Sequence, residues 1–350
     1  MDFNIGPRMV KTGLAVALTL LITGILEMEL EIVAAMAAVL AMQPSIMRSF
    51  KYIKEVVISN GIGLIFALLG MVLVGNNPIS VGAVVIISIA INIRLGLNKT
   101  VSLTVLTIVN MMLASYEDTI NIIYVLERLS LVGIGVISAF IVNVLVYPPD
   151  HQKILFSMIK KASEKTNFLL RVIPNKTMSV PHMKDEDREV EKLINKSRDY
   201  FEIISDERNS LFIRKRIDFL RNIVIYKHMI RVLRKKHTLI QQLEINLENI
   251  EVIESGKSHL IKNLVSEMNT YSENVLLMYE DRIILDSDLQ KETKIAMRIT
   301  INNLIETLQG SDYEKWEYVF PIANSIIELF YELDKLERFV RMKEIRRNKQ

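Results

Sequence analysis

The sequence predicts an all-α protein: a six-span transmembrane helical bundle followed by a cytosolic helical bundle. Half of the 350 residues are apolar, yet the charged side chains are distributed very unevenly, with 17 in the first 150 residues and 66 in the remaining 200. Such a division is typical of a membrane region joined to a soluble one. We therefore expect a transmembrane domain at residues 1–150 and a cytoplasmic helical domain at residues 151–350.

Six apolar runs mark the expected spans in the first half. They lie at about 12–26, 30–43, 56–74, 81–93, 97–114 and 129–147. A bilayer asks for about 20 apolar residues per helix, and only the third, fifth and sixth runs come near that length. The shorter runs are compatible with short spans, re-entrant hairpins or buried helices.

The basic residues near the ends of the runs favour six crossings. If all six runs cross, one side of the membrane holds ten Lys and Arg residues, and the other side holds only Arg128. Basic residues collect on the cytoplasmic side of membrane proteins. The pattern therefore predicts a multi-pass protein of the cell membrane with both termini in the cytoplasm.

Small residues recur four positions apart within the expected spans. This spacing lets helix backbones approach closely in lipid, where packing drives association. The pairs are Ala34 and Ala38, Ala37 and Ala41, Gly63 and Ala67, and Gly135 and Ala139. They predict a compact bundle.

Polar residues at membrane depth are the candidates for contact with a substrate, because a buried charge is costly there. On the expected cytoplasmic side and within the spans they are Gln43, Arg48, Asn92, Arg94 and Asn110. Arginines at span ends also serve as membrane anchors, and amides also join neighbouring helices. Both interpretations remain open for these residues.

The expected outer edge carries the candidates for gating or proton relay, which are Glu27, Glu31, Glu127 and Arg128. Glu127 and Arg128 directly precede the last span, so they could form a paired anchor or a gate. Acidic outer loops also arise simply from topology.

The second half shows the apolar periodicity of five or six helices, for example at Ile322, Ile326, Leu329, Leu333 and Leu336. We expect breaks near 174–181, 255–256, 287 and 310–311. A basic helix at about 208–236 has three interpretations, namely a solvated face, contact with anionic lipid headgroups, and pairing with acidic partners in the bundle. No nucleic-acid partner is expected, because no recognition module accompanies these residues.

The sequence contains no motif for catalysis or for a cofactor. Cysteine is absent, the five histidines are scattered without metal-ligand spacing, and no phosphate-binding glycine motif occurs. We therefore expect no enzyme, no metal site and no cofactor.

The order of features resembles the bacterial aromatic acid exporter family, which is related to fusaric acid resistance proteins. The resemblance rests on Arg8 and Lys11 before the first span, the Ala-Ala-Val-Leu-Ala-Met-Gln-Pro-Ser segment at 37–45, Arg94-Leu-Gly-Leu, and Glu127-Arg128 before Gly133-Ile-Gly135 and a Tyr147-Pro148 exit. It covers residues 5 to 150, and the tail is similar to that of half-length Gram-positive members.

This resemblance implies an exporter of aromatic or related organic carboxylates that acts as a homo-oligomer in the lipid bilayer. A small organic anion would be its substrate. The rival interpretation is a membrane-anchored scaffold or sensor whose helical tail binds a cytosolic partner. The scarcity of charge inside the spans is compatible with the rival as well.

Overall fold

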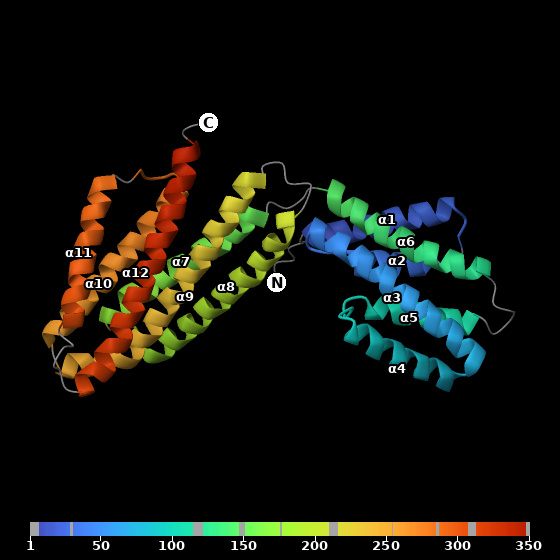
Figure 1. Ribbon diagram of the computed structural model, residues 1–350, viewed down its shortest axis with the longest axis horizontal. Helices are drawn as coiled ribbons and strands as arrows, with labels where there is room; N and C mark the ends of the chain where they lie inside the picture. Colours follow the sequence, from blue (N-terminus) through green and yellow to red (C-terminus); the bar gives the residue numbers. More distant parts are fainter. Residues whose placement is uncertain are drawn as a thin grey trace. The chain divides into compact units, whose positions relative to one another are not determined.

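A computed structural model describes residues 7–28, 31–114, 122–146, 151–175, 177–209, 216–253, 255–284, 287–306 and 313–347. Within these ranges the protein is all-α, which confirms the predicted fold class. The chain divides into two compact units (Figure 1). We call helices α1–α6 unit 1 and helices α7–α12 unit 2, and we describe each unit by itself.

The helices of unit 1 are α1 (Pro7–Ile25), α2 (Glu31–Ala41), α3 (Ile46–Leu73), α4 (Pro78–Arg94), α5 (Val101–Ala114) and α6 (Ile122–Leu145). Those of unit 2 are α7 (His151–Val172), α8 (Val180–Asp206), α9 (Arg216–Ile253), α10 (Ser255–Tyr279), α11 (Ser287–Glu306) and α12 (Tyr313–Arg347). Two short 3-10 turns follow α7 and α8.

Three helices of unit 1, α1, α3 and α6, are long and apolar enough to cross a membrane. The fifth run was expected to reach span length, and the structure describes 14 of its residues as the helix α5. Gly96, with a φ of 76°, ends α4, and the turn through Leu97 and Thr100 delays the start of α5. Conversely, α1 begins five residues earlier than its apolar run, at Pro7.

The third helix also begins ten residues earlier than its apolar run. Ser45 caps α3, accepting a hydrogen bond from the backbone N–H of Arg48 at 3.2 Å. Arg48, Lys51 and Lys54 then form the first turns of α3, which a search for apolar residues leaves out. The predicted exit at Tyr147-Pro148 lies outside the described residues.

Close backbone contact between α2 and α6 forms the centre of unit 1. A Cβ added to Gly135 would lie 2.2 Å from the carbonyl oxygen of Ala34 and 2.9 Å from the Cβ of Ala37. Ala34, Ala37 and Ala38 are fully buried. The predicted packing through small residues is therefore confirmed at this contact.

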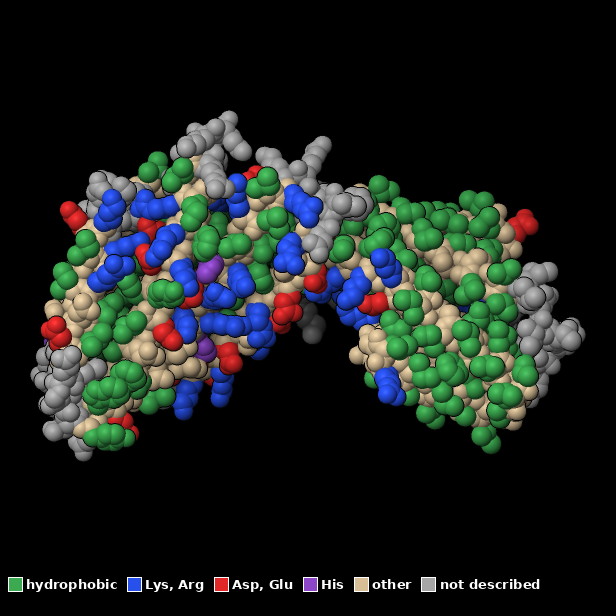
Figure 2. All heavy atoms as spheres, viewed as in Figure 1, with side chains coloured by type: hydrophobic (Ala, Val, Ile, Leu, Met, Phe, Trp, Pro, Cys, Tyr) green, Lys and Arg blue, Asp and Glu red, His purple; other side chains and the backbone are tan. Residues whose placement is uncertain are grey.

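Figure 2 shows how differently the surfaces of the two units are composed. Hydrophobic side chains cover most of the visible face of unit 1, whereas Lys, Arg, Asp and Glu are scattered over unit 2. Unit 2 has its own core, in which α9 packs along α12 and against α7, α8 and α10. The expected breaks near 174–181, 255–256 and 287 agree with the ends of these helices.

The basic helix of unit 2 differs from its expected extent, since α9 begins at Arg216 and Arg208 belongs to a 3-10 turn. Its basic residues have different surroundings. The Nζ of Lys235 lies 2.6 Å from a carboxylate oxygen of Glu328 on α12, so an acidic partner within the bundle is confirmed for this residue. Lys236 is fully buried and is neither solvated nor available to lipid.

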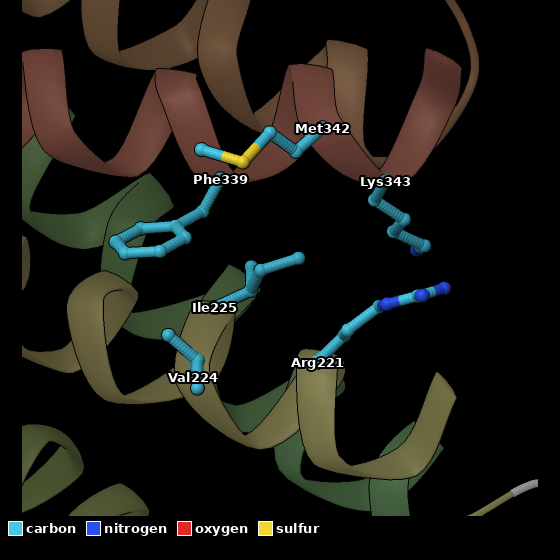
Figure 3. A pocket seen from close by; sticks show the side chains of 6 residues that line it. All are labelled: Arg221, Val224, Ile225, Phe339, Met342 and Lys343. Carbon is cyan, nitrogen blue, oxygen red and sulfur yellow. The ribbon is translucent and has the colours of Figure 1, made fainter. Parts of the chain in front are cut away.

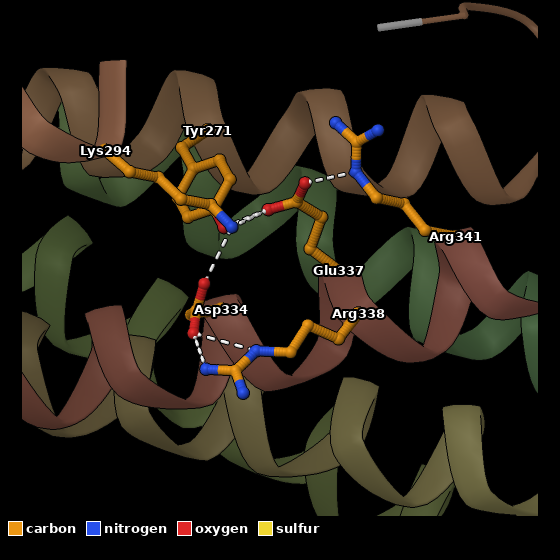
Figure 4. A network of polar contacts seen from close by, with 6 residues as sticks. All are labelled: Tyr271, Lys294, Asp334, Glu337, Arg338 and Arg341. Atoms are coloured by element: carbon orange, nitrogen blue, oxygen red, sulfur yellow. Dashed lines mark hydrogen bonds and ion pairs between the residues drawn. The ribbon is translucent and has the colours of Figure 1, made fainter. Parts of the chain in front are cut away.

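A network of charged side chains joins α11 and α12 in unit 2, and the Tyr271 hydroxyl of α10 donates to its Glu337 at 2.6 Å (Figure 4). Lys294 on α11 lies between Asp334 and Glu337 of α12, and its Nζ is 2.7 Å from Asp334 Oδ1. Arg338 and Arg341 bond the same two carboxylates. Burial disfavours the charged form of both acids, but the hydrogen bonds from Lys294 and the arginines outweigh it, so the pKa of each is lowered.

Candidate functional site

A buried lysine lies where α1, α6 and the turn between α2 and α3 meet. Lys11 is only 7% exposed, and its Nζ donates to the Oδ1 of Asn143 at 3.1 Å. The Nδ2 of Asn143 donates in turn to the Oγ of Ser49 at 2.8 Å and to the backbone oxygens of Gln43 and Ser45. We call these five residues the Lys11 cluster.

The local sequence explains why the cluster forms at this turn. Pro44 lacks a backbone N–H, and α2 has already ended at Ala41, so the carbonyl groups at the turn need partners from elsewhere. The Nδ2 of Asn143 donates to the backbone oxygen of Gln43, and the Nη2 of Arg8 lies 3.4 Å from the backbone oxygen of Met42. The cluster thereby ties three helices together.

The cluster concentrates positive charge and hydrogen-bond donors. Half-buried Arg48 lies in the first turn of α3, whose N-terminus adds a partial positive charge. Among the described residues, the acceptors of the hydrogen bonds in the Lys11 cluster are amide, hydroxyl and backbone oxygens and no carboxylate. Such surroundings suit the binding of an anion.

Lys11 was expected only as a basic residue at the end of a span. A signal for its burial is nevertheless present in the sequence. Lys11, Ala15, Thr19 and Thr23 follow one another at intervals of four, and the last three are fully buried. A lysine that continues a stripe of small and hydroxyl residues on one helix faces the bundle rather than the lipid.

Two of the five predicted substrate residues, Gln43 and Arg48, lie at or beside the Lys11 cluster. The others have separate surroundings. Asn92 is fully buried and donates to the oxygen of Ser88 in its own helix, and half-buried Asn110 donates likewise to Leu106. Arg94 is exposed in the last turn of α4.

The four predicted gating residues have different degrees of burial. Glu27 is exposed in the turn after α1 with a φ of 47°, and half-buried Glu31 begins α2. Glu127 is half-buried. Arg128 is only 1% exposed, and its Nη2 lies 3.4 Å from the backbone oxygen of Leu106 on α5. The guanidinium thus points into the bundle, between α6 and α5.

A neutral polar pair lies deeper in unit 1. The hydroxyl of Thr107 on α5 donates to the Oδ1 of Asn60 on α3 at 2.6 Å, and both side chains are buried. Through this contact the Asn60 amide joins α3 to α5, a role that amides commonly have between membrane helices.

Comparisons with known proteins agree with this architecture. Residues 3–146 match the family model described as "Aromatic acid exporter family member 1". The chain is also 26% identical to the UPF0421 protein YgaE of Bacillus subtilis (strain 168) over 342 residues, which cover 96% of this chain and 95% of the relative.

A second relative, the UPF0421 protein OB2406 of Oceanobacillus iheyensis, is 24% identical over 266 residues, which cover 73% of this chain and 75% of the relative. The matched family region spans all of α1–α6 up to residue 146 and includes every residue of the Lys11 cluster. Residues 3–146 are thus similar to the aromatic acid exporter family, as their resemblance predicted, and three of the helices in this region are long and apolar enough to cross a membrane.

Proposed function

We propose that this protein exports aromatic or related organic carboxylates and that the Lys11 cluster, with Arg48, is the place where the anion first binds. The observation that supports this most is the buried ammonium of Lys11 in a family domain of exporters. Lys11 bonds to neutral oxygens and to no carboxylate in the described cluster, so an anionic ligand can supply the counter-charge.

The proposed topology has six spans with both termini cytoplasmic. It places the Lys11 cluster on the cytoplasmic side, where an exporter takes up its substrate. The 11 residues of α2 are about 16 Å long, which is shorter than a bilayer core of about 30 Å. Since α2 packs between α1 and α6, protein rather than lipid surrounds much of it, and a short span is tolerated there.

We propose the proton gradient as the energy source, with Glu27, Glu31 and Glu127 as the candidate relays. Asn92, Arg94 and Asn110 would form the path beyond the first binding place, and Arg128 would hold α5 against α6 near the outer gate. These roles rest on the predicted topology.

Uptake of labelled 4-hydroxybenzoate into inverted membrane vesicles tests the proposal, measured with and without a proton gradient. We expect gradient-dependent accumulation that falls about tenfold or more in Lys11→Met and in Arg48→Gln, because each removes one charge-assisted contact with the anion. Lys51→Gln is the matched control, because the Lys51 side chain is 74% exposed.

The proposal is wrong if the wild type accumulates no acid from a broad panel, or if Lys11→Met and Arg48→Gln transport as well as Lys51→Gln. Immunoblots of the vesicles keep the comparison at equal amounts of protein. The Arg48→Ala, Arg94→Ala double variant then tests whether Arg94 contributes to the same path.

The proposed homo-oligomer can be tested by cross-linking, because the chain contains no cysteine. An apolar groove of about 410 Å³ runs between α1 and α2, and the exposed side chain of Met36 lines it. Cross-linking of Met36→Cys in membranes into a dimer would place a second copy at this groove. Failure of every single-cysteine variant across α1–α6 to cross-link would contradict the oligomer.

The second candidate, a membrane-anchored scaffold, is favoured by one observation. Unit 2 has an extensive hydrophobic core of its own, which transport through unit 1 does not require. A folded fragment 151–350 that retrieves one specific cytosolic protein would support the scaffold, provided that the vesicles show no transport.

A further inference from the structure

Unit 2 contains a small pocket between α9 and α12, which we call the α9–α12 pocket (Figure 3). Its volume is about 200 Å³, and it is lined by Arg221, Val224, Ile225, Phe339, Met342 and Lys343. Pockets for drug-sized molecules measure about 300–1,000 Å³, so this one suits a smaller ligand, with room for a single ring.

The apolar walls of the pocket are held in place by packing. Ile225 is 1% exposed. The ring of Phe339 stacks on His228, with centroids 4.9 Å apart and planes 26° apart, and the Nδ1 of His228 lies 3.1 Å from a carboxylate oxygen of Glu332. A flat apolar group that enters the pocket therefore meets preformed surfaces.

Both charged residues of the lining are cations, and they converge. Figure 3 shows the guanidinium of Arg221 and the ammonium of Lys343 pointing toward the same end of the pocket, with Phe339 at the opposite end. The Nη1 of Arg221 lies 3.2 Å from the Oδ1 of Asp218, and the Nζ of Lys343 lies 3.9 Å from the centroid of the Tyr279 ring. These contacts position the two cations from outside the pocket.

A carboxylate that enters this end of the pocket meets both cations and is attracted by each of them. A guanidinium has five N–H donors and an ammonium has three, so a carboxylate can accept from both. Asp218, which lies on the same helix as Arg221, is 51% exposed, so water screens its effect on the pocket.

We propose that the α9–α12 pocket binds a small monocarboxylate with a flat or branched apolar body. The carboxylate lies between Arg221 and Lys343, and the body lies against Ile225 and Phe339. A phospholipid is a poor fit, because its two long chains exceed the pocket. The site belongs to unit 2 and is distinct from the Lys11 cluster, so the proposal goes beyond transport and gives the tail a ligand of its own.

The test uses the full-length protein in mild detergent and 4-fluorobenzoate as the probe, followed by fluorine NMR line broadening. The protein carries Lys11→Met and Arg48→Gln, which remove the proposed transport site. Further variants are Arg221→Gln with Lys343→Gln, which removes the cations, and Val224→Trp, which fills the pocket from a position that is 38% exposed.

Lys335→Gln is the matched control, because Lys335 also lies on α12 but contacts the Tyr331 ring outside the pocket. Neutral 4-fluorobenzamide controls for binding by shape alone and for partition into detergent. Circular dichroism confirms that each variant is folded before it is compared.

We expect 4-fluorobenzoate to bind the Lys11→Met, Arg48→Gln protein and to bind about tenfold more weakly after loss of the two cations, since charge-assisted contacts disappear. Val224→Trp should abolish binding, and Lys335→Gln should leave it unchanged. The proposal is overturned if 4-fluorobenzoate does not bind, if the amide binds equally well, or if a folded protein without the two cations binds as before. Transport is measured separately in vesicles, so a failure of the proposed transport function would not change the result of this binding experiment.

Discussion

Each unit of the protein buries one lysine against asparagine, and the two lysines have different neighbours. Lys11 in unit 1 bonds to Asn143, whose other contacts are a hydroxyl and backbone oxygens. Lys236 in unit 2 bonds to Asn167 and Asn269, and Asn167 donates to the carboxylate of Glu273 at 3.1 Å. Unit 1 therefore surrounds its lysine with neutral groups, whereas unit 2 adds a negative charge nearby.

The same contrast extends to the rest of each unit. Helices α3 and α5 are joined by a threonine and an asparagine, and α2 approaches α6 through glycine and alanine. Helices α11 and α12 are joined by the charged Lys294 network, to which α10 adds the hydroxyl of Tyr271. Charged side chains are costly inside a lipid bilayer, so membrane helices are joined mainly by close packing and neutral hydrogen bonds. Helices outside the bilayer can also be joined by ion pairs.

The largest expected effect comes from breaking the Lys294 network. Lys294→Met leaves Asp334 and Glu337 without their central cation, and loss of one partner of a buried ion pair costs about 3 kcal/mol. Denaturant unfolding of the full-length protein, followed by the fluorescence of its single tryptophan, Trp316, measures this loss. The exposed Lys291 on the same helix is the control, and equal losses in Lys291→Met and Lys294→Met would contradict the contrast.

The next effect tests the close packing in unit 1. Gly135→Ala forces a Cβ against the backbone of α2, and overpacking of this kind costs about 2 kcal/mol. A Cβ at Gly133, two residues away on α6, meets nothing within 4 Å, so Gly133→Ala should be neutral or slightly stabilising. Loss of helix content during titration from mild detergent into sodium dodecyl sulfate measures both. If Gly135→Ala and Gly133→Ala lose their helix content at similar midpoints, α2 and α6 are further apart than in this structure.

The third effect is a pH dependence that belongs to unit 2. Burial lowers the pKa of Lys236 from its ordinary value of 10.5 to about 7, so the unfolded chain binds a proton that the folded chain lacks between these values. Stability should therefore rise with pH from about 7 to about 10.5, by up to about 1.4 kcal/mol per unit.

Lys236→Met removes this titration, so the difference in pH dependence between the two proteins isolates it. Trp316 fluorescence during denaturation at several pH values is the measurement. If the free energy of unfolding instead depends on pH equally in the wild type and in Lys236→Met, the neighbours of Lys236 stabilise its charged form enough to cancel the cost of burial.

The smallest effect is expected for the neutral pair in unit 1. Thr107→Val removes the hydrogen bond to Asn60, and such bonds between membrane helices contribute about 0.6 kcal/mol on average. Thr104→Val is the control, because in the described contacts the Thr104 hydroxyl bonds only to the backbone oxygen of Thr100, directly before α5, and not to another helix. The same titration into sodium dodecyl sulfate compares them. A loss as large as that of Lys294→Met would remove the contrast between the units.

Much of the architecture could be predicted from residue patterns. The apolar runs and the change in charge density predicted helices throughout and a change of character near residue 150, because hydrophobicity and periodicity are local properties. The bounds were less predictable. The first turns of α3 contain basic residues, so a search for apolar residues misses them. The same search ignores helix caps and left-handed turns such as the one at Gly96, after which α5 starts later than its apolar run.

The candidate site was only partly predictable. Gln43 and Arg48 were identified because a polar turn between apolar runs is conspicuous, but Lys11 was counted only among the basic residues near the ends of the runs. Glu127 and Arg128 were expected to form a paired anchor or a gate, and the structure adds that the Arg128 guanidinium points toward α5. Neighbours in a helical sequence point about 100° apart, so adjacency in the chain does not place two side chains together.

The sequence by itself determined the all-α class, the apolar character of the first half and the small residues through which α2 and α6 pack, because each depends on composition or on a spacing along one helix. Only the tertiary structure decided which polar groups meet. The Lys11 cluster joins residues 132 positions apart, and the α9–α12 pocket joins α9 to a helix about 100 residues later. Such meetings depend on how helices cross and rotate in the folded protein, which no local pattern contains.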